Sequence, residues 1–256
     1  MSSQQPALTL FVIGLMGLSV LALIHGDFAL VWQPVPTWVP ARTAIAYATG
    51  LLMIGIAVGL LFEPGRPIAV RVLLPYLLVW SMLKVPDILR APGSESSWLG
   101  LGELRLLLSG GAMLFARLAS LANNSRLGFL VGERGARIAS VLFGLSIIPI
   151  GLSHIVYLQQ TVDFVPSWLP FRSALAVITG AGQIASGLGV LFGVLPSIAA
   201  WAEAGQTSLY TLLVWLPKLL TGEGTRLNWT AFFVSWILTA AAWVVAQNIT
   251  AVRRSS

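Results

Sequence analysis

The chain has 256 residues, of which 57% are hydrophobic and only 9% are charged, and its mean hydropathy is +0.86. A typical soluble domain has about 25% charged residues, so this composition excludes a soluble globular protein, a coiled coil and a disordered chain. The net charge is +6, but the basic residues are scattered along the chain and predict no nucleic-acid surface. We therefore expect the lipid bilayer to be the main partner of this protein.

Apolar stretches long enough to cross a bilayer occur along most of the chain. A transmembrane helix needs about 20 mostly apolar residues. In chain order the candidate spans are 7–24, 43–62, 67–85, 99–118, 138–157, 173–192, 196–217 and 227–252. Gly193 and Pro196 favour a tight turn between the sixth and seventh spans rather than one long helix. The sequence thus predicts an all-α membrane protein with about eight transmembrane helices.

Two segments of the chain repeat each other. Nearly half of the positions in 35–62 recur in 165–192 at an offset of 130 residues, including a Pro-x-Trp-x-Pro loop that begins at Pro36 and at Pro166. Four spans in each copy give both copies the same orientation in the bilayer. We therefore expect two parallel four-helix-bundle repeats. The predicted boundaries are 1–122 for the first repeat, 123–137 for a polar connecting loop and 138–256 for the second repeat.

Lys and Arg residues next to the spans predict the orientation, because they are enriched on the cytoplasmic side. The totals on the two sides are nearly equal, but the connecting loop and the pair Arg253 and Arg254 favour both termini in the cytoplasm. No Lys or Arg precedes Arg42, so the first span lacks the basic region of a signal peptide. We expect a multi-pass protein of a bacterial inner (cytoplasmic) membrane that retains its first helix.

The loops after the first and fifth spans contain the first candidate site. The residues concerned are His25, Asp27, Trp38, Arg42, His154, Asp163, Trp168 and Arg172. Histidine can relay protons or bind a metal. However, the chain has only two His and no Cys, so we predict no metal site and no Cys-based cluster. The alternative is structural, with Trp anchoring the membrane surface and Pro setting the start of the next helix.

The seventh span contains the second candidate site. Glu203, Gln206, Thr207 and Tyr210 have the spacing i, i+3, i+4 and i+7, so they lie on one helix face, and Gln183 adds a polar group on the sixth span. A carboxyl group inside a bilayer is costly and generally faces a cavity or a partner. The pattern predicts either a buried contact that fixes helix register, with Arg71 as a hypothetical ion-pair partner of Glu203, or a proton relay or a ligand's polar head.

A further group of charges surrounds the start of the fourth span. Lys84, Asp87 and Arg90 are spaced as i, i+3 pairs, and Glu103 and Arg105 follow them. We expect these residues to form solvated or interfacial ion pairs, which contribute little stability.

Several of these motifs together resemble the DoxX-like family of bacterial membrane proteins. They are a His at the end of the first helix, the Pro-x-Trp-x-Pro loop, a Thr-Gly in a Gly-rich second helix and an Asn-Trp-Thr that opens the last helix at Asn228. Family members are usually single four-helix units, whereas this chain would be two fused copies. Its first copy lacks the Asn-Trp-Thr and has Glu103 and Arg105 in that helix. The resemblance implies a helical membrane fold and an association with membrane redox chemistry.

Two functions follow from these observations. The first is a non-catalytic or accessory subunit that docks a redox partner subunit or a quinone as its cofactor. The alternative is a carrier or binding protein for a small or lipid-like solute at the repeat interface. No nucleophile with an orienting base can be assembled from the sequence, so we predict no catalytic residues, and a stand-alone enzyme ranks third behind these two functions.

Overall fold

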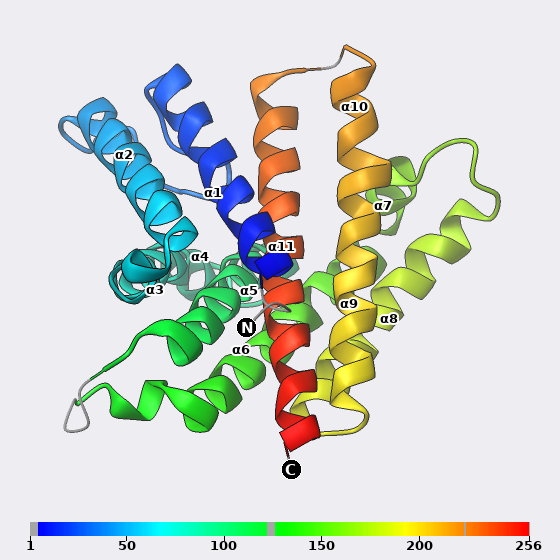
Figure 1. Cartoon of the computed structure of the whole chain (residues 1–256). Coiled ribbons are helices and arrows are strands. Elements are labelled where there is room, and N and C mark those ends of the chain that lie inside the picture. Colours follow the sequence, from blue (N-terminus) through cyan, green and yellow to red (C-terminus); the bar gives the residue numbers. More distant parts are fainter. Residues whose placement is uncertain (1–4, 122–125, 223, 256) are drawn as a thin grey trace.

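The computed structural model describes residues 5–121, 126–222 and 224–255, and within these residues the chain forms helices and no strands (Figure 1). This confirms the prediction of an all-α protein. The α-helices are α1 (Gln5–His25), α2 (Arg42–Leu61), α3 (Arg66–Leu83), α4 (Val85–Arg90), α5 (Glu95–Leu118), α6 (Gly132–Val156), α7 (Leu158–Phe164), α8 (Arg172–Leu191), α9 (Pro196–Tyr210), α10 (Leu216–Leu220) and α11 (Arg226–Ser255). Short 3₁₀ turns lie at Glu63–Gly65 and Gly128–Leu130, and a π-helical turn, Thr211–Trp215, joins α9 to α10.

Seven helical segments in the described part of the chain are long and apolar enough to cross a membrane. They are Pro6–His25, Arg42–Leu61, Glu63–Arg90, Glu95–Leu118, Gly132–Val156, Arg172–Leu191 and Arg226–Ile249. The chain is therefore a multi-pass membrane protein. The predicted span 196–217 is helical but is not among the seven, because residues such as Glu203 and Gln206 lower its hydropathy and a π-helical turn interrupts it. The count of eight spans stays a prediction.

The long helices pack in a closed ring. α1, α2, α3, α5, α6, α8, α9 and α11 each pack against the next member in chain order, α11 packs against α1, and α5 also contacts α11. Figure 1 shows α11 between α1 and α9. Two of these pairs, α5 with α6 and α11 with α1, join the two predicted repeats, and one hydrophobic core draws on both halves. The halves therefore do not form two separate bundles.

The ends of the loops before α2 and α8 share their local geometry at an offset of 130 residues. Ala41 and Phe171, which precede the two helices, both adopt the left-handed conformation, with φ values of 52° and 55°. The first residues of the helices, Arg42 and Arg172, each donate from Nε to the carbonyl oxygen seven residues earlier, at 3.2 and 3.0 Å. The sequence match between 35–62 and 165–192 thus corresponds to a shared local structure.

The region predicted as a connecting loop is shorter than expected. Residues 122–125 lie outside the described part of the chain, and α6 already begins at Gly132. Its first turns contain Glu133, Arg134 and Arg137, so a polar helical segment precedes the apolar span. The length of the apolar stretch underestimates the length of such a helix, because its polar first turns lie outside that stretch.

Candidate functional site

A cavity of ≈ 480 Å³ lies between α5, α6, α7, α8, α11 and the segment that runs from α9 through the π-helical turn. In Figure 1, α8 and α9 meet where a short turn joins them and diverge toward the other end, where α7 lies between them. Leu106, Ile150, Leu175 and Leu238 are among its many apolar wall residues. Its volume and apolar walls are typical of binding sites for small molecules, whose volumes are roughly 300–1,000 Å³.

Glu203 and Gln183 form the polar end of the cavity that is nearer the α8–α9 turn. Both side chains line it and each is only 1% exposed. Gln183 Nε2 donates to Glu203 Oε1 at 3.1 Å. The other two oxygens, Glu203 Oε2 and Gln183 Oε1, have no hydrogen-bond partner among the described residues. Because an unsatisfied buried polar group destabilises a fold, this pair is unlike ordinary core packing.

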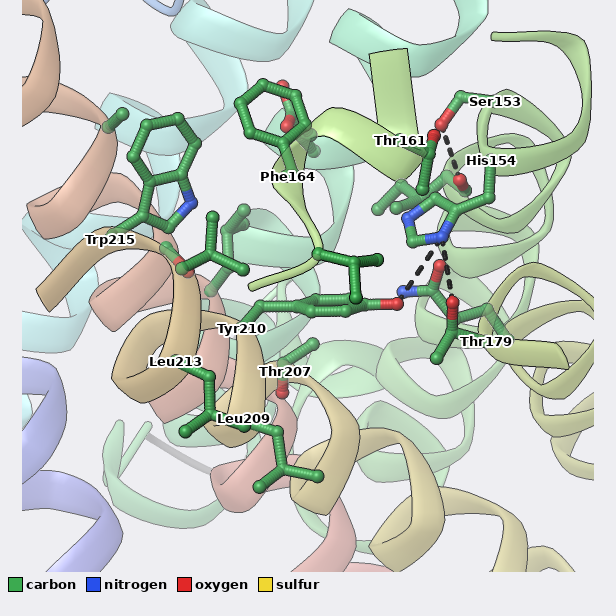
Figure 2. A pocket seen from close by; sticks show the side chains of 18 of the residues that line it. Ser153, His154, Thr161, Phe164, Thr179, Thr207, Leu209, Tyr210, Leu213 and Trp215 are labelled. Atoms are coloured by element: carbon green, nitrogen blue, oxygen red, sulfur yellow. Dashed lines mark hydrogen bonds between the residues drawn. The ribbon is translucent and has the colours of Figure 1, made fainter. Parts of the chain in front are cut away.

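A second polar group also lines the cavity, and Figure 2 shows His154 pointing toward Tyr210 and Thr179. His154 Nδ1 is 3.2 Å from Thr179 Oγ1 and 3.4 Å from the Tyr210 hydroxyl. Gln206 Nε2 donates to the Tyr210 hydroxyl at 2.8 Å and to the Thr179 carbonyl at 2.9 Å. Of the predicted polar face, Glu203, Thr207 and Tyr210 line the cavity, and His154 lines it with them.

Two glycines bring α6 and α8 close enough for the His154–Thr179 contact. A Cβ atom on Gly151 would lie 2.6 Å from the Gly180 carbonyl oxygen, and one on Gly180 would lie 2.7 Å from the Gly151 carbonyl oxygen. Only a residue without a side chain fits at either position. The close approach places His154, three residues after Gly151, directly beside α8.

The π-helical turn at Thr211–Trp215 shapes the wall beyond Tyr210. Pro217 has no N–H to bond the carbonyl group of Leu213, and the N–H of Leu216 instead bonds the Thr211 carbonyl oxygen five residues earlier. Such wide turns are frequent at functional sites. Here Leu213 and Trp215 both line the cavity (Figure 2).

Aromatic rings lie at the α7 end of the cavity. The Phe164 and Trp215 rings are 5.5 Å apart, and Figure 2 shows them beyond Tyr210. Lys218 Nζ lies 4.8 Å from the centroid of the Phe164 ring and 5.1 Å from that of Trp215. Through these cation–π contacts α7 is held against α10 at this end.

Glu103 supplies a second carboxyl group to the cavity wall, and its predicted ion pair with Arg105 is wrong. Its Oε2 accepts a hydrogen bond from Trp32 Nε1 at 2.7 Å. Arg105 lines a separate groove on the other side of α5, because residues two positions apart do not share a helix face. The neighbouring prediction is confirmed: Lys84 and Arg90 lie 3.6 and 3.9 Å from the Asp87 carboxylate.

Arg71 does not pair with Glu203, so that hypothesis is also wrong. The Arg71 guanidinium donates to the Ala119 carbonyl oxygen at 2.9 and 2.6 Å and to that of Ser120 at 2.6 Å. These contacts satisfy carbonyl groups at the end of α5, which have no partner within the helix. Sequence spacing could not reveal this nearer set of acceptors.

The first predicted loop site contains an ion-pair cluster. Asp27 pairs with Arg42, and its Oδ2 lies 3.0 Å from Arg226 Nη2 at the start of α11. The Phe28 N–H donates to Asp27 Oδ1 at 2.8 Å. Partial burial alone would raise the pKa of Asp27, but the Phe28 N–H and the two guanidinium groups outweigh it and lower this pKa below its ordinary value. The cluster ties together the ends of α1, α2 and α11.

The remaining loop residues do not assemble into a site. His25 is exposed, and Trp38 and Trp168 are 80% and 70% exposed, as expected for anchors at a membrane surface. The carboxylate of Asp163 accepts a hydrogen bond from Gln159 at 3.3 Å, and Arg172 donates to backbone carbonyl oxygens. Of the eight predicted loop residues, His154 is the one that the described cavity wall contains.

The sequence therefore located the polar face of α9 but missed Trp32, Glu103, Phe164 and Trp215 as residues of the same cavity. Glu103 had a usable signal, because a carboxyl group within an apolar span is itself costly. The aromatic residues had none, since Trp and Phe occur throughout this chain. Comparison of the chain with family models, with curated proteins and with solved structures finds no match.

Proposed function

We propose that this protein binds a small, lipid-like solute in the cavity and carries it or presents it within the membrane. The observation that supports this most strongly is the Glu203–Gln183 pair, which is fully buried at the end of an apolar cavity and retains two oxygens without a partner in the described structure. Binding sites for small molecules combine apolar walls with a few convergent polar groups in this way.

The stability of the fold alone does not account for the pair. Removing both polar groups in favour of apolar ones of similar shape is often neutral or stabilising, so a merely structural role would not favour them. A bound molecule with a complementary polar group would satisfy both oxygens, and its apolar part would contact the leucine and isoleucine walls. The ligand would thus offset the free energy lost by burying the pair.

The same proposal includes the location and origin of the chain. We place it in a bacterial inner membrane with eight spans and both termini in the cytoplasm, as two fused copies of a DoxX-like unit. The helical segment 196–220 would be the eighth span, since a continuous run of α-helical and π-helical turns connects its ends. The shared geometry at the ends of the loops before α2 and α8 supports the two copies.

A second candidate is the accessory redox subunit, with a quinone in the cavity and a redox protein as partner. The His154–Tyr210 pair favours it, because an imidazole N–H or a phenol hydroxyl in mid-cavity can donate a hydrogen bond to a quinone carbonyl. The two candidates share one cavity and differ in the molecule that it holds.

Native mass spectrometry of the purified protein tests the proposal, with fragmentation of any molecule it releases. Thr207 lines the cavity, so the ring of Thr207→Phe would fill it. Leu212 is 48% exposed, so Leu212→Phe adds a ring outside the cavity on the same helical segment. We expect one retained small molecule on the wild type and on Leu212→Phe, and none on Thr207→Phe. A quinone mass supports the second candidate. Equal retention by both variants, or no retained molecule on the wild type, contradicts the proposal.

A further inference from the structure

The charges of the cavity wall are all of one kind. Glu103 and Glu203 line it, and no Lys or Arg occurs among its described wall residues. Neither carboxyl group has an ion-pair partner within the described part of the chain: Glu103 contacts the Trp32 indole and Glu203 contacts the Gln183 amide. A buried carboxylate without a countercharge is strongly disfavoured. The Glu203 end of the wall, which has no cation near it in the described structure, is therefore complementary to a ligand that brings a positive charge.

The free atoms at the polar end are hydrogen-bond acceptors when Glu203 is ionised, as it would be beside a bound cation. Gln183 points its amide nitrogen at Glu203 Oε1, which leaves Gln183 Oε1 and Glu203 Oε2 without partners in the described structure. A group that fits this end must donate hydrogen bonds. A protonated primary amine has three N–H bonds, enough for both oxygens, whereas an alcohol has one O–H and a quinone carbonyl has no donor.

An ammonium group of the protein lies next to the α7 end of the cavity, although Lys218 itself is not a wall residue. Lys218 Nζ sits over the Phe164 and Trp215 rings, which are also wall residues. Aromatic faces attract organic cations in general, and the attraction increases where water is excluded. Because Lys218 already contacts these rings and repels a second cation, an amine would bind at the Glu203 end, about 18 Å further along the helix at 1.5 Å per residue.

We propose that the ligand is a lipophilic amine, whose ammonium group bonds Glu203 Oε2 and Gln183 Oε1 while its hydrocarbon part lies along the apolar walls. This inference rests on the proposed function, because it assigns the chemical class of the molecule that the cavity holds. It separates the two candidates above, since the Glu203 end requires a positive charge and hydrogen-bond donors, and a quinone has neither.

The test compares three amphiphiles with the same hydrocarbon chain: dodecylamine, dodecanol and dodecanoic acid. Affinity is measured from the shift in melting temperature of the protein in phosphatidylcholine nanodiscs, for the wild type and for Glu203→Gln. We expect the wild type to prefer the amine to the other two by about tenfold or more, and Glu203→Gln to lose most of that preference. Glu63→Gln, which removes an exposed carboxylate outside the cavity, serves as the matched control and should retain it.

The outcomes distinguish failure of the ligand class from failure of the binding site. If dodecanol or dodecanoic acid binds the wild type as well as the amine does, or if Glu203→Gln weakens all three equally, the ligand is not an amine. If none of the three amphiphiles shifts the melting temperature of the wild type more than that of Thr207→Phe, the cavity is not a binding site. The proposed function then fails as well. Should Glu203→Gln not fold, Gln183→Met removes the second acceptor and should reduce the amine preference in the same direction.

Discussion

The two halves of the molecule use equivalent positions in opposite ways. At an offset of 130 residues, Leu73 of α3 corresponds to Glu203, and Met53 of α2 corresponds to Gln183. Leu73 and Met53 are 0% and 2% exposed and belong to the main hydrophobic core. The first half thus has apolar packing where the second half has a buried polar pair.

The aromatic residues follow the same contrast. Trp80, which corresponds to Tyr210, packs against Phe28 and Tyr76 with ring centroids 5.6 and 5.9 Å apart. In the second half the region around Tyr210 remains open as the cavity. Equivalent helices therefore border a filled core in the first half and a cavity in the second, where α5 of the first half completes the wall, and a few side chains make the difference. The filled half shows which packing the fold prefers for stability, so the open half points to function.

Truncation of the equivalent aromatic residues tests this contrast with the largest expected effect. Trp80→Ala should reduce the free energy of unfolding by about 3–5 kcal/mol, because it creates a void in a packed cluster. Tyr210→Ala should reduce it by less than half as much, since its ring already borders a cavity. Chemical unfolding in detergent micelles measures both values. Equal losses would mean that the second half is as tightly packed as the first.

The ion-pair cluster around Asp27 should give the next largest effect. Asp27→Asn leaves Arg42 and Arg226 without their carboxylate and should cost about 2 kcal/mol of stability, whereas Asp163→Asn in the second half should cost almost nothing. The same unfolding assay compares the two variants. A similar small loss for both would show that the cluster does not hold the ends of α1, α2 and α11.

Acid should weaken the same cluster. Because the folded-state pKa of Asp27 lies below its ordinary value of 3.8, its stabilising contribution is present above that value and is lost as the pH falls through the folded-state pKa. Wild type and Asp27→Asn should therefore differ in stability at neutral pH and converge in strong acid. A difference that persists at low pH would contradict this origin of the stabilisation.

Replacing the buried polar pair of the second half by the apolar residues of the first should have a smaller effect on stability, and one of opposite sign. The double variant Glu203→Leu with Gln183→Met gives the polar end the residue types of its first-half equivalents, Leu73 and Met53. It should raise the free energy of unfolding by about 1–2 kcal/mol and remove binding, whereas Gln183→Met alone should destabilise the protein by leaving Glu203 without a partner. A destabilised double variant would show that the pair serves the fold.

The smallest effect is expected at the α7 end of the cavity. Lys218→Gln removes the cation–π contacts with Phe164 and Trp215 and should cost about 0.5–1 kcal/mol at this partly exposed place. Hydrogen exchange of α7 should increase, while that of α4, the short helix in the first half, should not change. Unchanged exchange in α7 would show that Lys218 does not hold this end of the cavity.

The sequence predicted those features that depend on local pattern. Apolar length located the spans, and helical spacing placed Glu203, Thr207 and Tyr210 on one face. Contacts between distant segments could not be predicted in this way. The Trp32–Glu103 hydrogen bond joins residues 71 positions apart, and Arg71 bonds carbonyl groups 48 and 49 positions away rather than Glu203. Such pairs depend on how helices pack around the ring, which neither hydropathy nor spacing records.

Photoaffinity labelling with a diazirine-bearing alkylamine tests the central claim most directly, because it compares both halves in one sample. After irradiation in nanodiscs, peptide mass spectrometry locates the adducts along the chain. We predict adducts concentrated in 203–215, which lines the cavity, and few in 73–85, the equivalent segment of the filled half. Equal labelling of both segments, or labelling confined to residues that face lipid, would contradict the claim that the ligand site lies beside 203–215 and not beside the equivalent segment of the first half.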